Sequence, residues 1–180
     1  MNPARKAPDT IQYGFKRVSP ANLLQEDNHP SYPSGPSREK WLQACLKPQL
    51  APTVPEEIAF LFEVARGSMA YGQFFLPLAS LATEQTYRVL EAAARCRCQQ
   101  LSLLKTKRVK TKGLPEVSFS EVIAALQKAG RIPQADWDAW RTMPYSRNRC
   151  SHPASQTILS RRDAAALLAY HCQLLNRLFQ

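Results

Sequence analysis

Long apolar segments are missing from this 180-residue chain, because Glu, Arg, Gln or Gly soon interrupts each hydrophobic stretch. A membrane-spanning helix needs about 18 consecutive apolar residues, so we expect no membrane span. The N-terminal region also lacks the hydrophobic segment of a secretory signal. We therefore expect a cytoplasmic protein with no membrane partner.

The spacing of the cysteines matches none of the common cysteine frameworks. The five cysteines are an odd number, which does not suit a set of paired disulfides. Cys96 and Cys98, the closest pair, would point about 200° apart on a helix and could not share a metal ion. We expect reduced thiols, and neither a metal nor a cofactor. The cysteines are Cys45, Cys96, Cys98, Cys150 and Cys172.

Acidic residues are also in deficit. The chain has 14 Asp and Glu against 24 Lys and Arg, so its formal net charge is +10. This excess favours a polyanionic partner, either nucleic acid or an anionic membrane surface. Charge alone does not identify the partner, because many basic proteins bind no polyanion.

Signals for β-strands are absent, since no segment alternates apolar and polar residues and no Asn-Gly hairpin turn occurs. Helical spacing is present instead. One stripe consists of Ile58, Leu61, Phe62, Ala65 and Met69, and similar stripes follow Pro77, Ser118, Pro133 and Ser160. The sequence therefore predicts an all-α fold, with a bundle of four or five helices spanning residues 53–180.

Three helix starts carry capping patterns, in which a side chain accepts from a free backbone N–H of the first turn. They are Thr53-x-x-Glu56, Ser118-x-x-Glu121 and Ser160-x-x-Asp163. Gly130 is expected to end the helix that begins after Ser118.

The N-terminal third has a different composition, with nine of the fourteen prolines at or before Pro55. Residues 1–52 are predicted to form an extended or partly ordered arm, with one short helix around Arg38–Leu46 that carries Trp41. The spacing of Pro30, Pro33 and Pro36 suits polyproline geometry, so the arm is either a linker or a docking motif for another protein.

A polar and basic cluster, Arg147-Asn148-Arg149-Cys150-Ser151-His152, precedes the last predicted helix and has no apolar periodicity. If the segment is helical, Asn148 and His152 share a face. Arg147 lies about 140° from His152, so one subunit cannot easily direct both side chains at one atom. Two copies that meet at an interface could bring them together.

Arg-Asn-x-x-x-His before the last helix of a small helical bundle resembles the signature of the HEPN superfamily (higher eukaryotes and prokaryotes nucleotide-binding domains). The resemblance covers about residues 55–180 and includes the Tyr71–Ala94 stretch and the helix with Trp137 and Trp140. It implies a HEPN-like bundle after the Pro-rich arm, and metal-independent RNA cleavage at the interface of a homodimer.

The resemblance implies a role for each residue of the motif. His152 would act as general acid and base, because imidazole titrates near neutral pH. Arg147 would stabilise charge on the phosphorane oxygens, and Asn148 would orient these groups. Arg149 and Ser151 are expected to support the motif or to contact phosphate, and not to act as catalysts. Attack by the 2′-hydroxyl would leave a 2′,3′-cyclic phosphate and a 5′-hydroxyl, so DNA should be inert.

A second basic segment spans residues 105–112 and contains five positive charges and no acid. It is either a solvated loop or a contact for the RNA backbone. The basic residues are Lys105, Lys107, Arg108, Lys110 and Lys112.

The same residues allow other functions. The motif could serve a catalytically silent HEPN-like module that dimerises or binds a partner, or the positive charge could bind nucleic acid without specificity. An active ribonuclease would need restraint by an antitoxin or another regulatory protein, as in toxin–antitoxin systems or phage defence.

Three further predictions concern the surroundings of the motif. Glu84, Arg88, Glu91 and Arg95 should form a salt-bridge ladder, or else Glu84 or Arg88 should support the motif. His171 is expected to be a hydrogen-bonded core residue. Pro144 disfavours helix at Met143, so the helix should bend or restart there.

Overall fold

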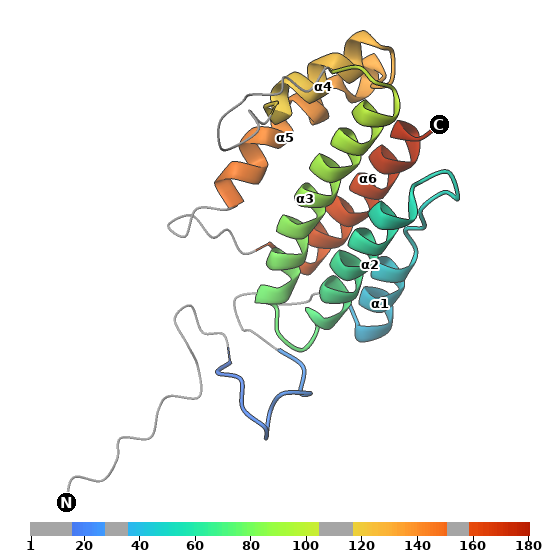
Figure 1. Cartoon of the computed structure of the whole chain (residues 1–180). Helices are drawn as coiled ribbons and strands as arrows, with labels where there is room; N and C mark the ends of the chain where they lie inside the picture. The colour runs from blue at the N-terminus through green and yellow to red at the C-terminus, as the bar shows by residue number, and fades with distance from the viewer. Residues whose placement is uncertain (1–15, 28–35, 105–116, 151–158) are drawn as a thin grey trace, which may run out of the picture.

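The computed structural model describes residues 16–27, 36–104, 117–150 and 159–180 (Figure 1). These residues form six α-helices and a short 3-10 helix, with no β-strand among them, so the all-α prediction is confirmed. The helices are α1 (Arg38–Leu46), α2 (Glu56–Tyr71), α3 (Pro77–Gln100), α4 (Phe119–Lys128), η2 (Gln134–Asp136), α5 (Trp137–Cys150) and α6 (Arg161–Leu178). None of the described helices is long and apolar enough to span a membrane.

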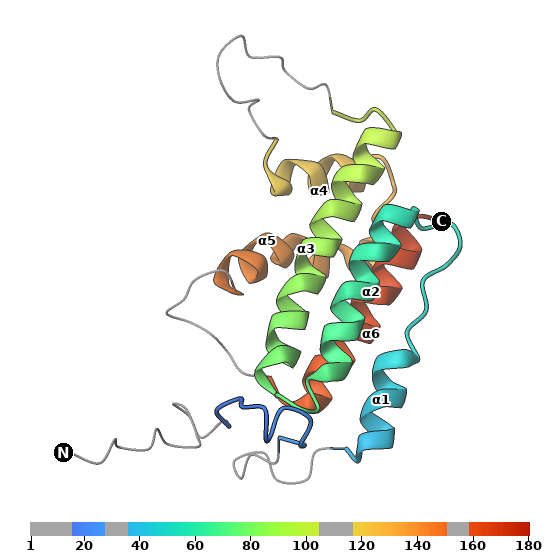
Figure 2. The same cartoon turned by 60° about the horizontal axis from the view of Figure 1, so that its bottom comes forward.

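The 24-residue helix α3 lies at the centre and packs against α2, α4, α5 and α6. The short helix α1 packs against α2 and α6. Both views place α4 and α5 on one side of α3, and α1 and α2 on the other (Figures 1 and 2). Helix α5 therefore approaches the bundle from the side of α3 and α4.

The predicted short helix is confirmed with the expected bounds, as α1 spans Arg38–Leu46. Trp41 is buried, and its indole Nε1 donates to the carbonyl of Ala70 at 3.1 Å. After the helix, the backbone N–H of Ala51 donates to Asn176 Oδ1 at 2.7 Å. Residues 36–52, which lie within the predicted arm, thus pack against the bundle.

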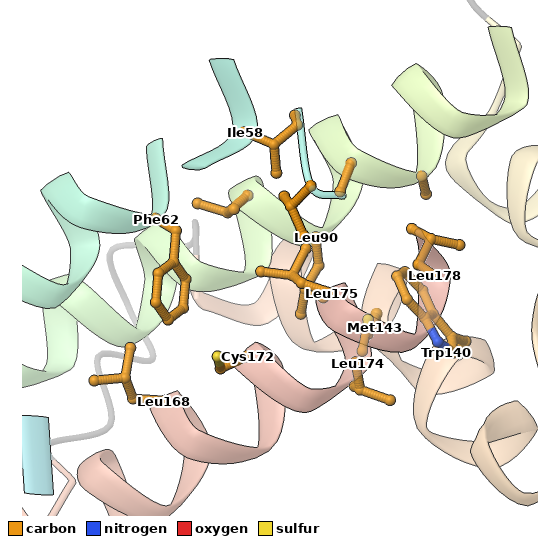
Figure 3. Close-up of a cluster of buried hydrophobic side chains, with 14 of the residues drawn as sticks. Ile58, Phe62, Leu90, Trp140, Met143, Leu168, Cys172, Leu174, Leu175 and Leu178 are labelled. Atoms are coloured by element: carbon orange, nitrogen blue, oxygen red, sulfur yellow. The ribbon is translucent and has the colours of Figure 1, made fainter. Parts of the chain in front are cut away.

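One continuous cluster of buried side chains connects all six helices. Figure 3 shows the contribution of α2, α3, α5 and α6 to this cluster. Helix α5 supplies Trp140 and Met143, and α6 supplies Leu174 and Leu178. This packing fixes the position of the C-terminal end of α5, because a close-packed core allows little displacement.

Two of the predicted caps are confirmed. Ser118 and Glu121 form a reciprocal capping box, and the Ser160 hydroxyl accepts from the N–H of Asp163. Gly130 follows α4 with φ of 68°, the left-handed conformation that ends many helices.

The capping pattern predicted at Thr53 is wrong. Helix α2 begins at Glu56, after Pro55, and has no side-chain cap. Pro55 has extended backbone, with ψ of 144°, so the chain becomes helical only after the proline.

Of the two alternatives predicted at Pro144, the restart is wrong, because α5 runs from Trp137 to Cys150 with Pro144 inside it, and the bend stays a prediction. Proline removes one backbone hydrogen bond and costs about 3 kcal/mol in a helix interior. Burial of Trp140 and Met143 on the preceding turn offsets this cost, since each large apolar side chain contributes about 1.5–3 kcal/mol.

The buried residue Asp27 holds the first described segment against the bundle. Its carboxylate Oδ2 accepts from the N–H of Leu76, directly before α3, at 3.0 Å. Arg161 Nη2 donates to the Asp27 carbonyl at 2.8 Å. A carboxylate at a helix N-terminus interacts favourably with the helix dipole, so Asp27 acts as a cap for α3.

The prediction of a hydrogen-bonded core histidine is confirmed for His171. Its Nδ1 lies 2.6 Å from Thr86 Oγ1 of α3, and both residues are buried. The Tyr87 ring packs edge-on against the imidazole. Burial lowers the pKa of His171 from 6.5 to about 4, so the ring is neutral at pH 7.

Because His171 is buried and neutral, we expect the protein to lose stability in acid. Between pH 6.5 and 4 the unfolded chain takes up a proton at His171 and the folded chain does not. The free energy of unfolding should therefore decrease as the pH is lowered through this window, by about 3 kcal/mol in total. Urea unfolding from pH 7 to 4.5 would show a flatter dependence for His171→Gln. Parallel curves for the two proteins would contradict the assignment.

Candidate functional site

Two of the predicted site residues, Arg147 and Asn148, have described side chains, and both lie in the last turn of α5. Arg149 also belongs to α5, but its side chain is not among those that the structure describes. Ser151, His152 and the basic residues of 105–112 lie outside the described residues. The convergence of Arg147 with His152 therefore stays a prediction.

The core packing of α5 determines where Arg147 stands. Trp140 and Met143 face the buried cluster, and Arg147 follows one turn after Met143 on the same side of the helix. Arg147 is thereby directed toward α3. Asn148 is exposed, and its Oδ1 accepts a hydrogen bond from Arg147 Nη1 at 3.1 Å.

Glu91 of α3 meets Arg147 across the helix interface. Its Oε2 lies 3.2 Å from Arg147 Nε. Its other oxygen, Oε1, accepts from Arg95 Nε at 3.1 Å and Arg95 Nη2 at 2.8 Å. The Glu91 side chain is only 16% exposed. Its carboxylate thus bridges two guanidinium groups at a mostly buried position.

Arg95 extends this network beyond α3. Its Nη1 donates to the carbonyl of Val117, the residue before the Ser118 cap of α4, at 2.8 Å. The network thus connects α3, α5 and the start of α4. We call Glu91, Arg95, Arg147 and Asn148 the α3–α5 cluster.

The salt-bridge prediction for α3 is confirmed for one pair, Glu91 with Arg95. Burial raises the pKa of Glu84, and the charge of Arg88 partly offsets this effect. Glu84 or Arg88 was the predicted support for the motif, whereas the structure places Glu91 beside Arg147. The spacing of Glu91 and Arg95 was visible in the sequence, but no local signal indicated that Glu91 also meets α5.

The charges of the α3–α5 cluster sum to +1, from two arginines and one glutamate. Arg147 is 42% exposed, so part of its guanidinium is open to solvent. Such an arginine can donate hydrogen bonds to phosphate oxygens. Glu91 limits this capacity, because any phosphate that approaches Arg147 must compete with a carboxylate already in place.

The described residues contain no group of three or more His, Cys, Asp or Glu side chains that could hold a metal ion. Among the cysteines whose side chains the structure describes, all four are free thiols. Burial raises the pKa of Cys45 to about 12 and that of Cys172 to about 11, and it also raises the pKa of Cys96 and Cys98. These thiols are protonated at neutral pH and are therefore weak nucleophiles.

The chain matches no protein-family model, no curated protein and no solved structure. What the chain does is therefore argued from its own residues.

The cluster predicts a measurable energetic coupling between Glu91 and Arg147. A double-mutant cycle with Glu91→Gln and Arg147→Ala should give a coupling of about 0.5–1 kcal/mol, because the pair is half-buried. The readout is the free energy of unfolding in urea. Asp138 and Arg141 of α5 provide the matched control, since their side chains are 86% and 64% exposed and should couple weakly. Equal coupling in both pairs would contradict a special role for Glu91.

Proposed function

We propose that this protein is a HEPN-type endoribonuclease that cleaves RNA without a metal ion. The observation that carries the proposal is the position of Arg147. It stands on the last turn of α5, anchored by Glu91 and 42% exposed, directly before the segment that contains His152. The net charge of +10 supports a polyanionic substrate.

The proposed reaction uses the substrate's own 2′-hydroxyl as the nucleophile. His152 removes the proton of this hydroxyl and a protonated imidazole donates to the 5′-oxygen that leaves. Arg147 stabilises the negative charge that builds up on the phosphorane oxygens. The products are a 2′,3′-cyclic phosphate and a 5′-hydroxyl, and no external water is needed for this step.

In this proposal, Asn148 orients the Arg147 guanidinium through the hydrogen bond from Nη1. Arg149, Ser151 and the basic segment 105–112 contact the RNA backbone. Two copies of the chain supply Arg147 and His152 to a shared centre, and an antitoxin or other regulatory protein restrains the activity in toxin–antitoxin or phage-defence biology.

One observation favours a second candidate function, a catalytically silent module that dimerises or binds a partner. Arg147 already has a carboxylate partner in Glu91, and an arginine in an ion pair can serve packing alone. This alternative predicts that the substitution of Arg147 or His152 alters stability but no cleavage activity.

The first experiment is the incubation of purified protein with total cellular RNA in EDTA. Wild type should produce fragments that end in cyclic phosphate, and His152→Ala should lose at least 100-fold in rate, the usual contribution of a general acid–base group. Arg147→Ala should also lose about 100-fold or more, as when one oxyanion donor is removed.

Arg141→Ala is the matched control, because Arg141 lies on the same helix and also pairs with an acidic residue. It should retain wild-type activity. Cleavage that survives His152→Ala would contradict the assignment of the centre. If wild type cleaves no RNA, even after any bound regulatory protein has been removed, the silent module is favoured.

A further inference from the structure

The outer face of α2 carries an exposed apolar stripe that the bundle does not use. Phe60 is 66% exposed, Val64 is 46% exposed and Tyr71 is 62% exposed, with the exposed Gly67 between them. Their spacing of four, three and four residues places all four on one side of the helix.

This stripe lies opposite the core face of α2. The core face consists of Ile58, Phe62, Ala65 and Met69, and each stripe residue lies two positions after one of these. Two residues correspond to about 200° around a helix, so the stripe points away from the bundle. Exposed apolar side chains grouped on one helix face are a candidate interaction surface.

Gly67 has no explanation within the described chain. Gly130 is required by its φ of 68°. Gly72 is required by close packing, because a Cβ there would lie 2.9 Å from the carbonyl oxygen of Met69 and 3.0 Å from Ala79 Cβ. A Cβ on Gly67 would have no neighbour within 4 Å. Glycine in a helix interior costs about 1 kcal/mol relative to alanine, and it is favoured where another backbone approaches closely.

The order of the four residues is self-complementary for an antiparallel pair of α2 helices. A two-fold axis midway between Val64 and Gly67 places Val64 of each copy level with Gly67 of the other. The same axis places Phe60 level with Tyr71 of the other copy, because the two pairs share one midpoint. A two-fold interface needs this kind of self-complementary surface.

Charge disfavours polyanionic occupants of the stripe. The exposed residues Glu56, Glu57 and Glu63 surround the stripe, and Arg66 is already paired with Glu63. These acids disfavour RNA or an anionic membrane at this face. In the antiparallel register, Glu63 stands level with Ser68 of the other copy, so the pairing places no two glutamates directly opposite each other.

We infer that the outer face of α2 is a self-association surface, on which a second copy of this chain packs antiparallel with its α2 close to Gly67. The α3–α5 cluster lies on the other side of α3 (Figure 2). This association is therefore independent of the proposed ribonuclease centre, and a failure of either proposal leaves the other intact.

Sedimentation equilibrium of the full chain tests the surface. Gly67→Arg should halve the mass of the wild-type particle, and it should still fold, because the side chain enters open space. Ala124→Arg is the matched control, since Ala124 is exposed on α4, which packs against α3 and α5. It should keep the wild-type mass. An unchanged mass for Gly67→Arg would overturn the inference.

Gly67→Ala gives a second, opposing readout. It should weaken self-association at least 10-fold, because the added methyl separates the two backbones. In dilute protein, where the monomer dominates, it should raise the Tm by about 2–4 °C through helix propensity. A raised Tm with unchanged self-association would show that Gly67 faces solvent and would overturn the inference.

Disulfide trapping tests the register, in a chain with Cys96 and Cys150 replaced by serine. A mixture of Phe60→Cys and Tyr71→Cys chains should form a crosslinked dimer under mild oxidation. Phe60→Cys alone should not, because the two copies of residue 60 would be about 16 Å apart along the helix axes. Equal crosslinking by Phe60→Cys alone, or none by the mixture, would overturn the antiparallel register.

Discussion

The burial of α3 among four other helices is the constraint on which the rest of the structure depends. Small side chains such as Ala82, Ala93 and Ala94 let the neighbouring helices approach. Its buried polar side chains must in turn find partners. The Thr83 hydroxyl donates to the Ala79 carbonyl, and the Ser80 hydroxyl accepts from the N–H of Leu159.

Glu91 follows from the same constraint. A carboxylate on a central helix is costly unless it is paired, and two guanidinium groups supply the pairing from α3 and α5. Arg147, which is proposed to stabilise the phosphorane oxygens, is thereby held by a structural ion pair. One interaction thus serves the stability of the bundle and positions the guanidinium at the end of α5.

The two proposed surfaces lie on different helices and have different chemistry. The α3–α5 cluster is polar and carries a net positive charge, whereas the stripe on α2 is apolar and bordered by acids. Because α2 and α5 pack on different sides of α3, association through α2 leaves the end of α5 accessible.

Local sequence signals determined the all-α class, the bounds of α1, the caps at Ser118 and Ser160, and the burial of His171. These features depend on periodicity and short-range hydrogen bonds, which a sequence displays directly. That α5 continues through Pro144 without a restart could not be predicted locally, because the burial of Trp140 and Met143 outweighs a local preference against helix. Only the tertiary structure decided that Glu91 meets Arg147, and that the glycine at position 67 faces outward with open space around it. Both facts depend on how distant helices pack, and no single helix carries that information in its own residues.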